Sequence, residues 1–125
     1  MTPIRVLLVD DNVAYRRHLA RVLAMQQDLV VVGEAGSGVE AIARARELRP
    51  DVVLMDFRME GLDGFSAARV IVEELPAARV FMLTAFPGAL DREKVERGGI
   101  HGLLTKDQPA TELFEAIRAS VLPRA

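Results

Sequence analysis

The chain contains no cysteine, which excludes thiolate metal sites, cysteine nucleophiles and disulfide scaffolds. It also has no hydrophobic run long enough to cross a bilayer, and no signal-type segment precedes Asp10. Basic residues are not in excess, since the net charge is -2 and the pI is near 5.7. Such a charge balance provides no basic surface for nucleic acid or anionic lipid. We therefore expect a cytoplasmic protein that binds neither nucleic acid nor membrane directly.

Glycine-rich phosphate loops are also missing. Neither GxGxxG nor GxxxxGK[ST] follows the first apolar run, so nucleotide binding is disfavoured and the glycines are expected in turns. The two histidines, His18 and His101, stand alone in the sequence and are expected to be structural or surface residues. Neither is expected to carry a phosphoryl group.

The length and the hydrophobic content predict one domain over 1–125. A chain of 125 residues, half of them hydrophobic, can bury a single core without a metal or disulfide staple. Four methionines stand in apolar contexts and are expected to fill that core: Met25, Met55, Met59 and Met82.

Short apolar runs alternate with amphipathic stretches along the chain. The runs are too short for helices and predict buried strands at 4–9, 29–32, 52–55, 80–83 and 103–104. Apolar residues at helical spacing predict helices over 13–25, 37–50, 63–76 and 109–123. Together with one weaker helix described below, this order predicts a doubly wound α/β fold, a five-stranded parallel sheet in the order 2-1-3-4-5.

Local signals mark where the helices begin. Ser37-x-x-Glu40 is a capping-box pattern, and Asp63 can cap the helix that follows it. In the first helix, Arg16, Arg17 and Arg21 are expected on the solvent face. The second strand ends in Gly33-Glu34-Ala35, and Glu34 has no evident role.

The helix between the fourth and fifth strands is the weakest of the five. Leu90 and Val95 are nearly its only apolar residues, so we expect it to be poorly anchored and mobile.

Polar residues follow four of the predicted strands. Asp10 and Asp11 follow the first, Asp56 the third, Thr84 the fourth and Lys106 the fifth. In open α/β sheets, sites lie at the carboxyl ends of the strands, near the point where the strand order reverses. We therefore expect these five side chains to converge.

The residue types in this group indicate phosphoryl chemistry. Three clustered carboxylates repel one another, and a hard divalent cation such as Mg²⁺ relieves that repulsion most simply. Asp56 can attack phosphorus, while Lys106 neutralises a phosphoryl oxygen and Thr84 donates a hydrogen bond to another. Positioning and charge neutralisation are most of what phosphoryl transfer needs.

The chain also carries an ordered set of residues that is typical of one protein family. The residues that carry it are Asp10-Asp11, Asp56 within VVLMDFRM, Gly61-Leu62-Asp63-Gly64, Thr84-Ala85 and Lys106. With this ordered set the chain resembles the response regulator receiver family over essentially its whole length, which implies a flavodoxin-like (αβ)5 fold.

The resemblance implies a role for each site residue. Asp56 is then the phosphoacceptor, and Asp11 is a metal ligand beside Asp56 and the backbone carbonyl of Arg58. Asp10 is an outer or water-mediated ligand of the same Mg²⁺. Thr84 and Lys106 sense the phosphoryl group.

The resemblance also implies partners. A sensor histidine kinase donates the phosphoryl group, and small acyl phosphates can substitute for it. The chain is then a phosphoacceptor signalling domain that assists its own phosphorylation and dephosphorylation, and not an enzyme. Lys106-Asp107 and EAIRASV resemble the subgroup that usually carries a helix-turn-helix DNA-binding output domain, which this chain does not contain. A homodimer is a further expected assembly, and the surface around the fourth and fifth helices is expected to change on phosphorylation.

Three residues depart from the family pattern. Glu60 and Asp107 stand where prolines are usual, and Leu103 stands where an aromatic residue commonly reports activation. A cis bond before Asp107 would cost about 3 kcal/mol, so a trans bond is expected. Leu103 has no hydroxyl to move, so a switch coupled to Thr84 would have to use packing or the fourth helix.

Other interpretations remain open. Each aspartate taken alone is more often a turn or cap residue than a ligand. A phosphorylation-independent interaction module would keep the fold without the chemistry. A phosphohydrolase resembling the haloacid dehalogenase group is disfavoured, because Arg58 stands where that chemistry needs a second acidic residue and cannot act as a general acid.

Overall fold

One parallel sheet organises the molecule. The computed structural model describes residues 2–59, 61–85 and 92–121. The strands are β1 (Ile4–Val9), β2 (Leu29–Ala35), β3 (Val52–Asp56), β4 (Arg79–Thr84) and β5 (Gly102–Thr105). They pair in parallel in the order β2-β1-β3-β4-β5. The predicted fold class and strand order are therefore confirmed.

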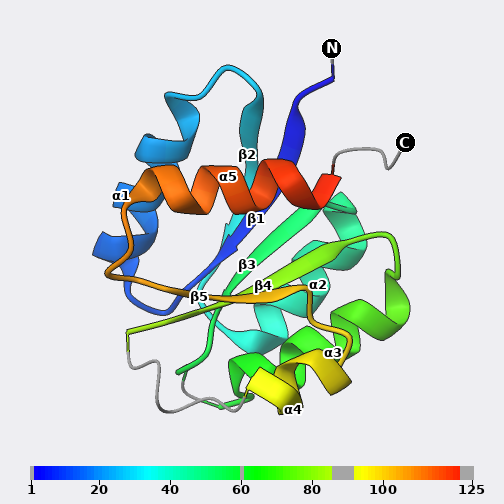
Figure 1. Ribbon diagram of the computed structural model, residues 1–125. Coiled ribbons are helices and arrows are strands. Elements are labelled where there is room, and N and C mark those ends of the chain that lie inside the picture. Colours follow the sequence, from blue (N-terminus) through cyan, green and yellow to red (C-terminus); the bar gives the residue numbers. More distant parts are fainter. Residues whose placement is uncertain (1, 60, 86–91, 122–125) are drawn as a thin grey trace.

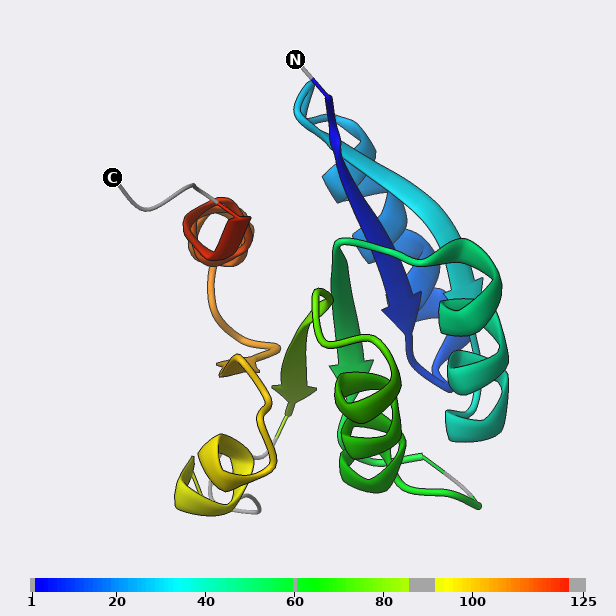
Figure 2. The same cartoon turned by 90° about the vertical axis from the view of Figure 1, so that its right-hand side faces the viewer.

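Helices cover both faces of this sheet. They are α1 (Val13–Ala24), α2 (Gly38–Leu48), α3 (Gly64–Glu74), α4 (Arg92–Arg97) and α5 (Ala110–Val121). Buried residues of α1 and α5 pack in one apolar cluster, and those of α2, α3 and α4 pack in another. Figure 1 shows α5 crossing in front of the sheet, with α2 and α3 behind it. In both ribbon views β5 runs between α5 and α4 (Figures 1 and 2).

The centre of the sheet is its most buried part. Every residue of β3 is buried, and its alternating side chains enter the two clusters in turn. A strand covered on both faces needs a continuous apolar run, which is why VVLM is uninterrupted up to Asp56. The single carboxylate at the end of this run is thus placed at the edge of the core.

The predicted helix starts are confirmed. Ser37 Oγ accepts a hydrogen bond from the backbone N–H of Glu40 at 3.1 Å. Asp63 Oδ1 accepts one from the backbone N–H of Ser66 at 2.8 Å. Each bond satisfies an amide that the first helical turn leaves without an internal partner.

Two expectations about apolar residues had different outcomes. Met25 was expected in the core, but it is 79% exposed because α1 ends at Ala24 and Met25 lies in the turn beyond it. Met55 and Met82 are buried and Met59 packs against the core, as expected.

The fourth helix has one firm anchor among the described residues. Val95 of α4 is buried against the cluster on the α3 side of the sheet, while Leu90 lies outside the described residues.

No helix within the described part of the chain is both long and apolar enough to span a membrane.

Candidate functional site

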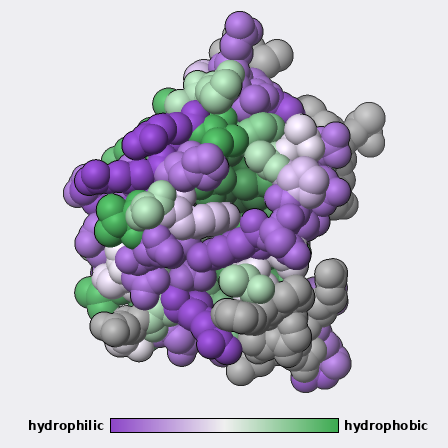
Figure 3. Space-filling view, turned by 90° about the vertical axis from the view of Figure 1, so that its left-hand side faces the viewer, coloured by the Kyte–Doolittle hydropathy of each residue, from purple (hydrophilic) through white to green (hydrophobic). Residues whose placement is uncertain are grey.

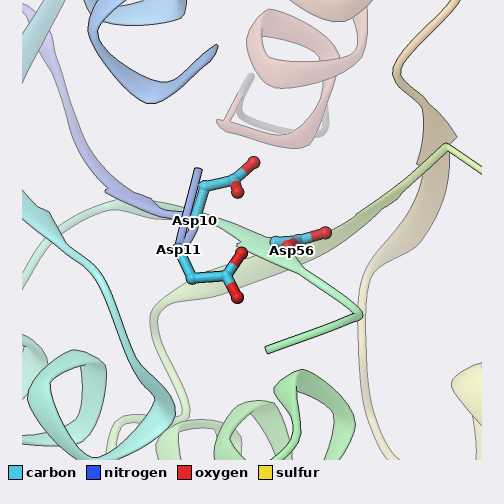
Figure 4. A group of neighbouring side chains, drawn as sticks. All are labelled: Asp10, Asp11 and Asp56. Atoms are coloured by element: carbon cyan, nitrogen blue, oxygen red, sulfur yellow. The ribbon is translucent and has the colours of Figure 1, made fainter. Parts of the chain in front are cut away.

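The three aspartates lie together at the carboxyl edge of the sheet. Val9 of β1 is the register partner of Met55 of β3, so the residues that follow these two reach the same edge. Carboxylate oxygens of Asp10, Asp11 and Asp56 lie within 4.8 Å of one another (Figure 4). Asp10 and Asp56 are buried and Asp11 is exposed, so the cluster opens to solvent on the Asp11 side.

Lys106 inserts its ammonium into this cluster. Its Nζ lies 2.6 Å from Asp10 Oδ2 and 3.4 Å from Asp56 Oδ1. The backbone N–H of Lys106 donates to the Thr84 carbonyl at 2.8 Å, which extends the parallel pairing of β4 and β5. The bond between Lys106 and Asp107 is trans, as expected, since no described residue follows a cis peptide bond.

Thr84 and Arg58 come from the same edge. Thr84 is buried and directly follows Leu83, the register partner of Asp56. The backbone N–H of Arg58 donates a hydrogen bond to the Asp56 carboxylate. All the residues predicted for the site are therefore gathered at the ends of four neighbouring strands.

The charges in the cluster oppose and compensate one another. Burial, and then the charge of Asp10, raise the pKa of Asp56 from its ordinary 3.8 to about 6. The Lys106 ammonium and the Arg58 N–H act in the opposite direction. Burial disfavours the charge on Lys106, but the hydrogen bond to Asp10 and the two carboxylate charges outweigh it and raise its pKa. Lys106 is thus a permanent cation that partly neutralises the site.

The open side of the cluster can hold a cation. Asp11 and Arg58 line a shallow depression of ≈ 380 Å³ together with Phe57, Met59 and Asp63. The three aspartates offer carboxylate oxygens here, which suit a hard divalent ion such as Mg²⁺. A set of oxygens that leaves one side open also leaves room for a phosphoryl oxygen on the same ion.

Arg16 is a supporting residue that the periodicity of the first helix did not reveal. It was expected on the solvent face, but its side chain is only 15% exposed. Its Nη1 donates to the Asp10 carbonyl at 2.7 Å, and its Nε donates to Glu34 Oε1 at 2.8 Å. Glu34, which had no evident role in the sequence, thus orients the arginine that holds the backbone of Asp10.

Gly64 is a second supporting residue, and it was expected only as a turn residue. A Cβ at this position would lie 1.9 Å from the Asp56 carbonyl oxygen. Only glycine lets the first turn of α3 approach the end of β3 so closely. The spacing Asp63-Gly64 was visible in the sequence, but the contact depends on tertiary packing.

Comparisons with known proteins agree with this geometry. The family model described as "Response regulator receiver domain" matches residues 6–118. The chain belongs to this family, whose members are signalling domains of two-component systems.

Individual relatives point in the same direction. The chain is 45% identical over 121 residues to the transcriptional regulatory protein LiaR of Bacillus subtilis, covering 94% of this chain and 56% of that protein. It is 40% identical to the response regulator protein VraR of Staphylococcus aureus, covering 92% and 55%. The chain thus spans about half the length of these curated relatives.

A solved structure of similar sequence shares the fold. The signal receiver domain of the response regulator NarL from Mycobacterium tuberculosis superimposes with a TM-score of 0.86 at 32% identity. The match covers 95% of this chain and 96% of that one.

The raised pKa of Asp56 predicts an unusual dependence of stability on pH. An acid whose pKa is higher in the folded state destabilises the fold as it ionises, so the penalty grows as pH rises from about 4 and is complete above about 6. Without divalent cations at neutral pH, Asp56→Asn should raise the free energy of unfolding by about 1–3 kcal/mol. Urea denaturation of both proteins across this pH range measures the difference.

The gain from Asp56→Asn should shrink toward zero as the pH falls below about 4, because the wild-type carboxyl then becomes protonated in both states. Asp51→Asn is a matched control, because Asp51 is an exposed aspartate at the opposite end of β3. An equal stabilisation by both substitutions would contradict the proposed repulsion within the cluster.

The contacts of Arg16 predict that its substitution destabilises the fold, whereas substitution of the adjacent Arg17 does not. Arg16→Met removes two charge-assisted hydrogen bonds and should lower the free energy of unfolding by about 1–3 kcal/mol. Arg17→Met removes the same charge from an exposed position and should change it by less than about 0.5 kcal/mol. Similar urea midpoints for the two variants would show that Arg16 does not support the Asp10 loop.

Proposed function

We propose that the chain is a phosphorylation-dependent switch that accepts a phosphoryl group on Asp56. The observation that carries this proposal is the arrangement of Asp56, a buried carboxylate that shares the Lys106 ammonium with Asp10 and opens toward Asp11. A purely structural ion pair would require one carboxylate beside the ammonium, whereas three aspartates lie together here. Membership of the receiver family supports the same conclusion.

The chemical step is a displacement at phosphorus. An oxygen of the ionised Asp56 attacks the phosphorus, and the bond from phosphorus to the leaving group breaks. The leaving imidazole nitrogen of a phosphohistidine, or the leaving carboxylate of an acyl phosphate, takes the electron pair. Lys106 neutralises a phosphoryl oxygen, and the Thr84 hydroxyl donates a hydrogen bond to another.

The metal in this proposal is Mg²⁺, with Asp11, Asp56 and the backbone carbonyl of Arg58 as direct ligands. Asp10 fits an outer, water-mediated role, because its oxygens already accept from Lys106 at 2.6 Å and from the backbone N–H of Asn12 at 2.9 Å. Bound Mg²⁺ would supply positive charge to the oxygens of the transferred group.

The proposed donor is a sensor histidine kinase acting in the cytoplasm. LiaR is described as a transcriptional regulator and is longer than this chain, which supports a DNA-binding output domain elsewhere in a longer protein or in a partner. A homodimer is a further proposed assembly.

The proposed output surface is formed by α4, β5 and α5. Lys106 directly follows β5, which runs between α4 and α5 (Figures 1 and 2). Movement of Lys106 and Thr84 toward the phosphoryl group would shift the population of conformations along this edge.

Intact mass measurement tests this function. Incubation of the chain with acetyl phosphate and Mg²⁺ should add the mass of one phosphoryl group to the wild type. Asp56→Asn removes the nucleophile and should abolish the adduct, and a chelator should suppress it. Asp51→Asn, which keeps the site unchanged, should be modified like the wild type.

An adduct that persists in Asp56→Asn would move the phosphoacceptor elsewhere. No adduct in the wild type, from acetyl phosphate and a cognate kinase alike, would favour a phosphorylation-independent interaction module. Continuous release of inorganic phosphate from small phosphate esters would instead favour a phosphohydrolase.

A further inference from the structure

The ammonium of Lys106 has an aromatic neighbour in addition to its two carboxylates. Lys106 Nζ lies 4.4 Å from the centroid of the Tyr15 ring on α1. This distance is within the range in which the negative face of an aromatic ring attracts a cation. Tyr15 is partly buried, and the Lys106 side chain is 18% exposed. The ring thus covers part of the ammonium in a site that is largely closed to solvent.

A cavity lies beside this pair. It has a volume of ≈ 180 Å³ and is lined by Tyr15 and Lys106 together with residues of α1, β5 and the start of α5. Thr105 and Gln108 are among its polar lining residues. Figure 3 views this side of the molecule, where hydrophobic surface is visible between hydrophilic side chains. There is therefore space, with polar groups at its wall, into which a flexible lysine could turn away from the aspartates.

The position of the ammonium is not fixed by the lysine itself, because its compact charge is carried on a flexible four-carbon side chain. Its nearer partner is Asp10 at 2.6 Å, and Asp56 is 3.4 Å away. A group that limits how far Nζ can swing therefore determines whether it stays within reach of Asp56. Among the described residues, Tyr15 both lies against the ammonium and lines the cavity into which the lysine could turn.

We propose that Tyr15 is a positioning residue whose ring holds the Lys106 ammonium between Asp10 and Asp56, ready for the incoming phosphoryl group. This inference rests on the proposed phosphoacceptor function. The ring, and not the phenol hydroxyl, is the part that acts. When a phosphoryl group arrives on Asp56, Lys106 moves toward its oxygens and leaves the ring.

The rate of phosphorylation by acetyl phosphate at saturating Mg²⁺ tests the role of the ring. Tyr15→Leu removes the aromatic face and should slow phosphorylation by about three- to tenfold. Tyr15→Phe keeps the face and should stay within about twofold of the wild type. Phe114→Leu is a matched control, because Phe114 is a buried aromatic residue of the same apolar cluster that lies over Arg118. It should lower stability but leave the rate unchanged.

The chain carries its own spectroscopic probe of this contact. Tyr15 is the one tyrosine in the sequence and there is no tryptophan, so emission from tyrosine reports on this ring alone. Beryllium fluoride with Mg²⁺, which mimics the phosphoryl group, should change this emission as Lys106 leaves the ring. In Lys106→Met the change should be absent even at beryllium fluoride concentrations that still block phosphorylation of Asp56 in this variant. This measurement needs no substitution at Tyr15, so it stands even if Tyr15→Leu does not fold.

The outcomes separate the two proposals. If the wild type forms no phosphoryl adduct, the proposed function fails and the role of Tyr15 fails with it. If the wild type is modified but Tyr15→Leu reacts as fast as Tyr15→Phe, only the positioning role is overturned. An emission change that persists in Lys106→Met would likewise show that the ring senses something other than the ammonium.

Discussion

The site depends on one electrostatic constraint, which is that two carboxylates are buried side by side and share one ammonium. Asp10 and Asp56 reach the same sheet edge because β1 and β3 are neighbours, and the pairing of these strands fixes the backbone at both positions. Burial of such charges is costly unless they are paired. Lys106 compensates only part of this cost, since the pKa of Asp56 remains raised to about 6. The remaining repulsion leaves the site able to gain free energy from added positive charge.

Contacts between distant parts of the chain hold this unfavourable arrangement in place. Arg16 ties the Asp10 backbone to Glu34 of β2, and Gly64 lets α3 pack directly against Asp56. Lys106 reaches Asp10 across 96 positions of sequence, because β5 lies at the other side of β3 and β4. The cluster therefore joins both halves of the sheet. In the proposed function, a change in its charge would act on the edge formed by β5 and its flanking helices, so that a local modification alters a distant surface.

The features of the fold and of the site that sequence could predict are those encoded locally. Short apolar runs and capping residues predicted all five strands and the α2 and α3 starts, and the polar residues after the strands predicted the site. Arg16 and Gly64 were misjudged because their contacts lie far along the chain, so neither helical periodicity nor turn preference could show them. Met25 was misplaced for a related reason, because apolar spacing does not reveal the residue at which α1 ends. Tyr15 is one of the apolar residues whose helical spacing predicts the first helix, and that spacing does not show its contact with Lys106.

The central claim is that the carboxylate cluster is a site of unrelieved repulsion that a divalent cation stabilises. Thermal denaturation of the metal-free chain with increasing MgCl₂ tests it most directly, with NaCl of equal ionic strength as the reference. Binding to the folded state alone should raise the Tm steadily with Mg²⁺ concentration. The rise should be largely lost in Asp11→Asn, whose side chain is exposed at the open side of the cluster. A Tm that follows ionic strength alone in both proteins would contradict the account.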